Sequence, residues 1–277
     1  MKPEASPTRR HLVRLTAAAA IGSAAVVGMA MTPSSAAKAA GRHSDPYCPP
    51  ICFLKGTRIL TDRGQQKIED LRIGDLVATH RGTLEPIKWI GRMSYERAER
   101  KRWQSEVAPV KVEASAIASG VPSRDLFLSQ RHAIFNGEGA LIPAKYLVNG
   151  ETLQIDAPAG LTRLEYFQLE FEEHEIIFAE EMPVESFLGG DDLREMFSNF
   201  AEYLRLYGPT SKRMTPYVPV YRYGLGKDDA IALLRIGVTA LGLNVRDPVQ
   251  AFHHRLEQRS KMLRGQQAAE AAAAAVS

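Results

Sequence analysis

The sequence predicts a mainly β domain followed by a helical extension. Three observations support this prediction: short alternating apolar runs between residues 57 and 186, closely spaced turn residues between those runs, and helical periodicity after Ser186. The start of the chain differs from both parts. We therefore predict a signal peptide at residues 1–39, a linker at 40–51, a β domain at 52–187 and a helical extension at 188–277.

Residues 1–39 resemble a twin-arginine export signal. Arg9 and Arg10 precede a moderately apolar run at residues 15–31, and small residues between 35 and 40 offer cleavage sites. Cleavage between Ala37 and Ala40 would yield an exported protein, periplasmic or extracellular, with no stable membrane span. The alternative is an uncleaved anchor, although the run is shorter than the roughly 20 apolar residues that cross a bilayer.

The charge balance argues against a nucleic-acid partner. The full chain has a net charge of +3 from 35 basic and 32 acidic residues, and residues 1–39 hold five of the basic and one of the acidic ones. The remainder therefore carries 30 basic and 31 acidic residues, a net charge of −1, with no basic excess for binding phosphates. No glycine-rich phosphate loop follows a predicted strand, so a dehydrogenase or kinase finds no support. We expect neither a cofactor nor a metal.

The β domain is predicted to consist of short strands joined by tight turns. Turn residues occur at 62–64, 73–75 and 81–82, where Gly and Asp favour tight turns. A charged stretch at residues 95–104 is ambiguous between helix and strand. The predicted strands are residues 57–60, 75–79, 87–90, 110–112, 126–128, 152–155, 164–171 and 176–178.

Cys52 begins the β domain, and Ser129-x-x-His132 follows at long range. A thiol on the first residue of a domain can attack the carbonyl group of the preceding residue, which here is Ile51. The pattern therefore points to self-directed acyl chemistry at the Ile51–Cys52 bond. The alternative is that Ser129 and His132 form a purely structural pair.

Cys48 is the second cysteine, and a disulfide with Cys52 is the default in an exported protein. The intervening Pro49-Pro50 favours an extended path of about 12 Å, whereas disulfide-bonded Cα atoms lie about 4.4–6.8 Å apart. We therefore favour a free Cys52 thiol. A disulfide stays the alternative, and it would remove the nucleophile.

Several of these motifs together resemble the Hint (Hedgehog/intein) domain, in its bacterial non-splicing subgroup. The resemblance covers about residues 52–187. It is carried by Cys52-Phe53, Gly56-Thr57, residues 68–77, 86–91, 124–126, 128–133, 141–144, 147–150, 174–177 and Glu185-Ser186.

The resemblance implies a horseshoe-like β fold whose first residue performs an N-to-S acyl shift. It implies that Cys52 is the nucleophile and that His132 donates a proton to the departing nitrogen. Ser129 would orient the scissile amide. His174 matches the downstream histidine of the family, although a histidine held by a backbone carbonyl at a strand end is an equal alternative.

Two departures from the family limit the expected chemistry. Splicing inteins end in His-Asn, whereas this chain has Glu185-Ser186, and serine has no amide with which to form a succinimide. Splicing by this route is therefore excluded. Gln168 stands where many inteins carry an acidic residue.

The extension is predicted to form three helices. Asp191 is expected to begin a helix that continues to Tyr207, a second spans residues 228–243, and a third starts at Asp247-Pro248. The Ala-rich tail from Ala268 is expected to be a frayed helix end. His253 and His254 are adjacent and point to different sides of a helix, which makes them a poor metal site.

Two function classes follow from the sequence. The first is an exported self-processing protein that cleaves at Ile51–Cys52. The second is a non-catalytic exported β scaffold or binding module. In either case the C-terminal helices could bind a protein partner, whose identity the sequence does not give.

Overall fold

We describe a computed structural model of the chain, which covers residues 51–98, 101–210, 214–221 and 247–276. The chain divides into two compact units, Met1–His43 and Ser44–Ser277, and the described residues all belong to the second. The predicted signal peptide, Cys48 and the expected helix at 228–243 lie outside the described residues.

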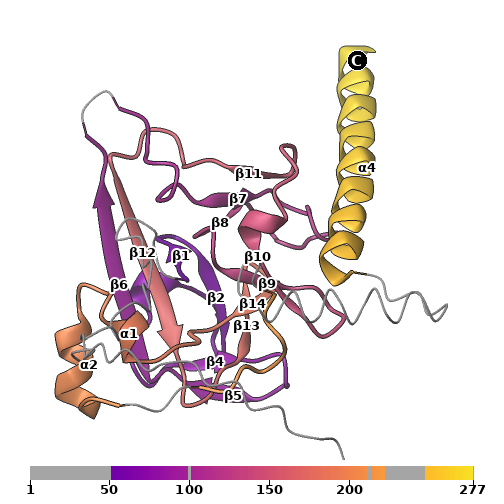
Figure 1. Ribbon diagram of the computed structural model, residues 1–277. Coiled ribbons are helices and arrows are strands. Elements are labelled where there is room, and N and C mark those ends of the chain that lie inside the picture. Colours follow the sequence, from indigo (N-terminus) through magenta and orange to yellow (C-terminus); the bar gives the residue numbers. More distant parts are fainter. Residues whose placement is uncertain (1–50, 99–100, 211–213, 222–246, 277) are drawn as a thin grey trace, which may run out of the picture. The chain divides into compact units, whose positions relative to one another are not determined.

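The described part is mainly β, which confirms the predicted fold class. One antiparallel sheet has six strands, and β1 lies between β8 and β12 within it (Figure 1). In spatial order its strands are β11 (Leu153–Ile155), β7 (Val110–Val112), β8 (Leu126–Leu128), β1 (Phe53–Leu54), β12 (Arg163–Glu170) and β6 (Trp89–Glu96).

A second antiparallel sheet has eight strands. Its order is β10 (Leu141–Pro143), β9 (Ala133–Phe135), β14 (Met182–Glu185), β13 (Ile176–Ala179), β2 (Arg58–Thr61), β4 (Leu76–Ala78) and β5 (Leu84–Pro86), and β3 (Gly64–Lys67) pairs with β2 alone. Gly64 has φ +83° in the turn between β2 and β3, a conformation that glycine adopts without steric cost.

Alternation along β1 and β12 separates two hydrophobic clusters. Phe53, Phe167 and Leu169 belong to the larger cluster, whereas Leu54 and Tyr166 belong to the smaller one. Because successive side chains of a strand point to opposite faces, β12 is buried on both sides over most of its length. Cys52 lies in the smaller cluster.

The helix expected from Asp191 to Tyr207 is interrupted. The structure has two short helices instead, α1 (Asp191–Arg194) and α2 (Phe200–Tyr207). Between them Asn199 accepts a hydrogen bond from the Arg92 N–H and donates one to the Ile90 carbonyl, so the chain pairs with the edge of β6. Satisfying the exposed groups of an edge strand outweighs helical continuity here.

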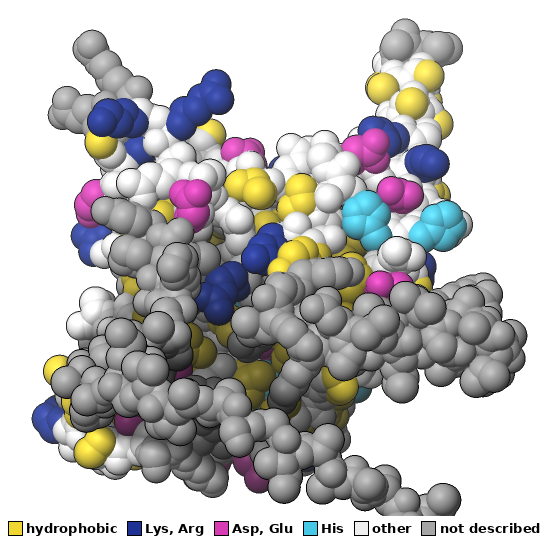
Figure 2. Space-filling model, in the orientation of Figure 1, with side chains coloured by type: hydrophobic (Ala, Val, Ile, Leu, Met, Phe, Trp, Pro, Cys, Tyr) yellow, Lys and Arg dark blue, Asp and Glu magenta, His cyan; other side chains and the backbone are white. Residues whose placement is uncertain are grey.

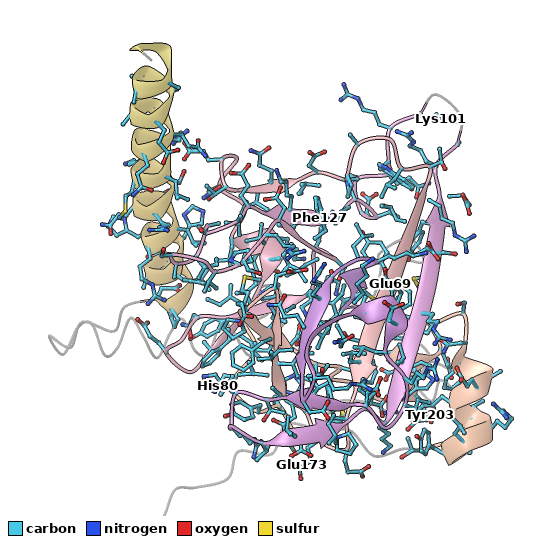
Figure 3. All side chains as sticks on the ribbon, turned by 180° about the vertical axis from the view of Figure 1, so that it is seen from behind. Glu69, His80, Lys101, Phe127, Glu173 and Tyr203 are labelled. Carbon is cyan, nitrogen blue, oxygen red and sulfur yellow. The ribbon has the colours of Figure 1, made fainter. Side chains whose placement is uncertain are left out.

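Tyr203 lies on α2 (Figure 3). It packs against Trp89 of β6, with ring centroids 5.3 Å apart. Both side chains are buried, and Phe197 joins them in the smaller cluster. The first part of the predicted extension therefore shares a hydrophobic cluster with the β domain.

The third predicted helix is present as α4 (Pro248–Val276). Asp247 Oδ1 accepts a hydrogen bond from the Val249 N–H at 2.9 Å, which satisfies one of the free donors at the start of the helix. Val249, Phe252 and Leu256 are buried in the larger cluster. The Ala-rich tail continues the helix to Val276.

Candidate catalytic site

Cys52 enters the six-stranded sheet directly before β1. Its side chain is fully buried, Ile51 is only 6% exposed, and the thiol is free. Burial raises the pKa of the Cys52 thiol well above its usual value, because the thiolate would lose its hydration. The thiol is therefore protonated at neutral pH.

Ser129 binds the backbone of Cys52 through two hydrogen bonds. The Cys52 N–H donates to Ser129 Oγ at 2.8 Å, and the Ser129 N–H donates to the Cys52 carbonyl at 2.9 Å. The first of these holds the nitrogen of the Ile51–Cys52 peptide bond. The structure thus places Ser129 against the amide that the sequence analysis expected it to orient.

The ring of His132 is fully buried next to β1, with its centroid 4.3 Å from that of Phe53. His132 Nε2 lies 3.0 Å from the carbonyl oxygen of Glu185. A carbonyl can only accept, so Nε2 carries the proton and Nδ1 is a lone pair. Nδ1 has no hydrogen-bond partner among the described residues.

Burial lowers the pKa of His132 to about 3, against the raising effect of the Cys52 and Glu185 backbones. The imidazole is therefore neutral at pH 7. A neutral ring with a free Nδ1 lone pair is a base rather than an acid. The sequence predicts a proton donor at His132, and a neutral ring would have to accept a proton before it could donate one from Nδ1.

His174 is also buried, but its ring contacts Tyr217 and Glu185 rather than Phe53. Its Nδ1 accepts a hydrogen bond from the Tyr217 N–H at 2.9 Å, and its Nε2 lies 3.9 Å from Glu185 Oε2. The acceptor role of Nδ1 places the ring proton on Nε2, toward the carboxylate. His174 is thus connected to His132 through Glu185.

Glu185 belongs to this cluster, although the sequence pattern did not assign it a role in the site. Its carbonyl holds His132, and its Oε1 accepts a hydrogen bond from the Ala133 N–H at 2.6 Å. It therefore fixes two consecutive residues at the start of β9. The pairing of β14 with β9, which brings Val184 opposite Ile134, makes these contacts, and no local sequence signal announces them.

The described residues contain neither a metal-binding cluster nor a membrane-spanning helix. No group of three or more His, Cys, Asp or Glu in that part of the chain could hold a metal ion. Histidine side chains lie at the surface of α4 (Figure 2), where His253 contacts Glu257 and His254 contacts Gln258. Of the helices that the structure describes, none has the length and apolar character needed to cross a membrane.

A family model of the Hint domain matches residues 51–191, just over half of the chain. The chain belongs to the Hint-domain family. The match begins one residue before Cys52 and contains Ser129, His132 and His174. No curated protein matches the chain significantly.

Solved structures similar to this Hint-domain protein include inteins. The crystal structure of the gp41-1 intein is 13% identical with a TM-score of 0.32, over 48% of this chain and 97% of the intein. The MchDnaB-1 intein is 13% identical with a TM-score of 0.31, over 48% of this chain and 98% of that one. A bacterial intein-like domain from Clostridium thermocellum is 12% identical with a TM-score of 0.33, over 49% and 98%.

Proposed function

We propose that this is an exported Hint-domain protein that cleaves its own Ile51–Cys52 bond through an N-to-S acyl shift, without splicing. One observation carries the proposal: the nitrogen that must leave, Cys52 N, donates a 2.8 Å hydrogen bond to Ser129 Oγ within a buried site. A fixed leaving group beside its own nucleophile lowers the entropy cost of the reaction.

We assign the proton transfers to His132 because its Nδ1 has no hydrogen-bond partner among the described residues and can accept a proton. Nδ1 takes the proton of the Cys52 thiol while Sγ attacks the Ile51 carbonyl carbon. The same proton then passes to the Cys52 nitrogen as the C–N bond breaks, which leaves a thioester and a free amine. Attack of water or another nucleophile on the thioester releases the chain that ends at Ile51 and restores the thiol.

This site is latent in its resting state. The pKa of the buried Cys52 thiol is raised and that of His132 is lowered, so transfer of the proton from sulfur to nitrogen is uphill. Latency suits an exported protein, because early cleavage at Ile51 would remove residues 1–39 before export. Arg9-Arg10 and the apolar run behind them support export by a twin-arginine route.

The C-terminal end of the β domain supports cleavage without splicing. Ser186 stands where splicing inteins carry asparagine, and its Oγ accepts a hydrogen bond from the Glu175 N–H at 2.9 Å. Serine has no side-chain amide that could cyclise and break the following bond. Among the described residues, position 186 therefore lacks the side-chain amide by which a splicing intein releases the chain that follows it.

The test is intact-mass analysis of purified protein that retains residues 40–51, with and without hydroxylamine or a small thiol. We expect added nucleophile to release the peptide ending at Ile51 from the wild type and to leave Cys52→Ala uncut. Masses of protein recovered after export also show whether residues 1–39 are removed.

Persistence of the uncut mass in every condition would favour the second candidate, a non-catalytic exported scaffold or binding module. Complete burial of the Cys52 thiol is the observation that favours this alternative. In that case the C-terminal helices would be the first place to look for a protein partner.

A further inference from the structure

Gln168 is a buried amide that the steps above leave unused. Its side chain belongs to β12 and is 1% exposed. The Leu169 N–H donates to Gln168 Oε1 at 3.2 Å, so the amide oxygen has a partner. Within the described residues, the Nε2 group has none. A buried donor without a partner is costly and calls for an explanation.

The strand register places Gln168 opposite Cys52. In the antiparallel pair of β1 and β12, Phe53 faces Phe167 and Leu54 faces Tyr166. One further step brings Cys52 opposite Gln168. Residues directly opposite each other point to the same face of a sheet, with Cβ atoms about 4.5–5.5 Å apart.

The smaller hydrophobic cluster supports this placement independently. Cys52, Leu54, Leu164 and Tyr166 all lie in that cluster, whereas Phe53 and Phe167 lie in the other one. Even-numbered residues of both strands therefore share one face. Gln168 continues that series, so its amide and the Cys52 thiol lie on the same side of the sheet.

The scissile carbonyl faces the strand that carries Gln168. The Cys52 N–H points to Ser129, which follows β8 on one side of β1. Val121–Pro122 is the cis peptide of the described residues, so the Ile51–Cys52 bond is trans. In a trans peptide the C=O and N–H point in opposite directions, which turns the Ile51 oxygen away from β8 and toward β12.

We propose that Gln168 Nε2 donates a hydrogen bond to the oxyanion that forms on the Ile51 oxygen when Cys52 Sγ attacks. The inference rests on the proposed acyl shift and adds a catalytic residue to it. Bond formation from sulfur to the carbonyl carbon moves an electron pair onto the oxygen. An amide donor that no other group occupies stabilises that charge without first breaking a bond. Collapse of the oxyanion returns the pair as the C–N bond breaks.

The experiment compares nucleophile-induced cleavage in the full chain retaining residues 40–51, for wild type, Gln168→Met, Gln168→Glu and the control Gln154→Met. Gln154 lies on β11 of the same sheet, and its Nε2 donates to the Glu151 carbonyl. We expect Gln168→Met to cleave about 100-fold more slowly than wild type, since loss of one oxyanion donor typically has this effect. Gln154→Met should stay within about twofold. The Gln168→Glu side chain can donate only while its buried carboxyl is protonated, so the rate of this variant should fall toward that of Gln168→Met as the pH is raised.

Urea unfolding supplies a second measurement. Methionine keeps the volume of Gln168 but removes Oε1 together with Nε2, so the Leu169 N–H loses its acceptor and the Gln168→Met midpoint should fall by about the loss of one buried hydrogen bond. Ser186→Ala, which likewise leaves one backbone N–H without its acceptor, is the matched control. A clearly larger fall in Gln168→Met than in Ser186→Ala would overturn the inference, because the amide nitrogen would then have a structural partner. A wild-type rate in Gln168→Met would overturn it too, while leaving the acyl shift intact. Failure of the wild type itself to cleave would instead sink the proposed function, and this inference with it.

Discussion

Gln168 and Glu170 lie two residues apart on β12, and therefore on the same face of the strand. Their side chains differ in whether their polar atoms have hydrogen-bond partners. Both oxygens of Glu170 accept hydrogen bonds from Arg194, each at 2.8 Å. Arg194 also pairs with Asp191 and lies over the rings of Phe187 and Tyr203. The amide nitrogen of Gln168 has no partner in the described part of the chain.

Under the proposed acyl shift, this difference separates polar groups that stabilise the fold from polar groups that take part in the reaction. The Glu170–Arg194 pair is buried and fully bonded, and it joins β12 to α1. Gln168 Nε2 and His132 Nδ1, in contrast, have no hydrogen-bond partner among the described residues. A fold is most stable where every buried polar group has a hydrogen-bond partner. A reaction, in contrast, needs polar groups that are free to bind the reacting atoms.

The largest expected effect on stability comes from breaking the ion pair between Glu170 and Arg194. Arg194→Ala should lower the free energy of unfolding by about 3–5 kcal/mol, because it leaves the Glu170 carboxylate buried without a counter-ion. Burial already raises the pKa of Glu170. The double variant Glu170→Met/Arg194→Met should lose much less. Urea denaturation measures both, and a single-variant loss below about 1 kcal/mol would contradict the structural role.

An intermediate effect on the free energy of unfolding is expected when the pH is lowered, because His132 titrates differently in the folded and unfolded chain. The pKa of His132 is about 3 when folded and about 6.5 when unfolded, so between these values the unfolded chain binds more protons. Acid therefore destabilises the fold, and this residue should lower the free energy of unfolding by about 2 kcal/mol from pH 7 to pH 5.

His132→Gln isolates this contribution, because the other titrating groups are common to both proteins. The stability difference between wild type and variant should shrink by that amount as the pH falls from 7 to 5. Urea denaturation at both pH values measures it. Parallel stability curves for the two proteins would show that the buried ring does not titrate as the structure indicates.

The smallest expected effect, a difference in cleavage rate between two serine variants, distinguishes structural from catalytic polar groups most directly. Ser129 and Ser186 are both fully buried and each accepts one backbone N–H, at 2.8 and 2.9 Å. Their alanine variants should each lose about 1–3 kcal/mol of stability, since each leaves a buried donor unsatisfied.

Cleavage at Ile51 should distinguish these two serines. Ser129→Ala should cleave roughly tenfold more slowly, the equivalent of one hydrogen bond in the transition state. Ser186→Ala should cleave at the wild-type rate. Intact-mass time courses measure both, and equal rates in the two variants would assign Ser129 a structural role alone.

Much of the strand pattern was readable from the sequence. Strands β7, β8 and β13 occur where alternation predicted them, because each buries apolar residues within a few positions. The short strands β9, β10 and β14 were missed. They are three or four residues long and largely buried, so they lack an alternating pattern.

The sequence by itself determined the mainly β class and the start of α4 at Asp247-Pro248, because these depend on local patterns. It also singled out Cys52, Ser129 and His132 as candidate site residues, because their residue types have distinctive chemistry. Only the tertiary structure decided that Glu185 holds His132, that β1 pairs with β12 in the register from which we place Gln168 opposite Cys52, and that β6 interrupts the helix after Arg194. These features depend on register and burial between segments far apart in the chain. Such non-local pairing leaves no periodic signal in the sequence.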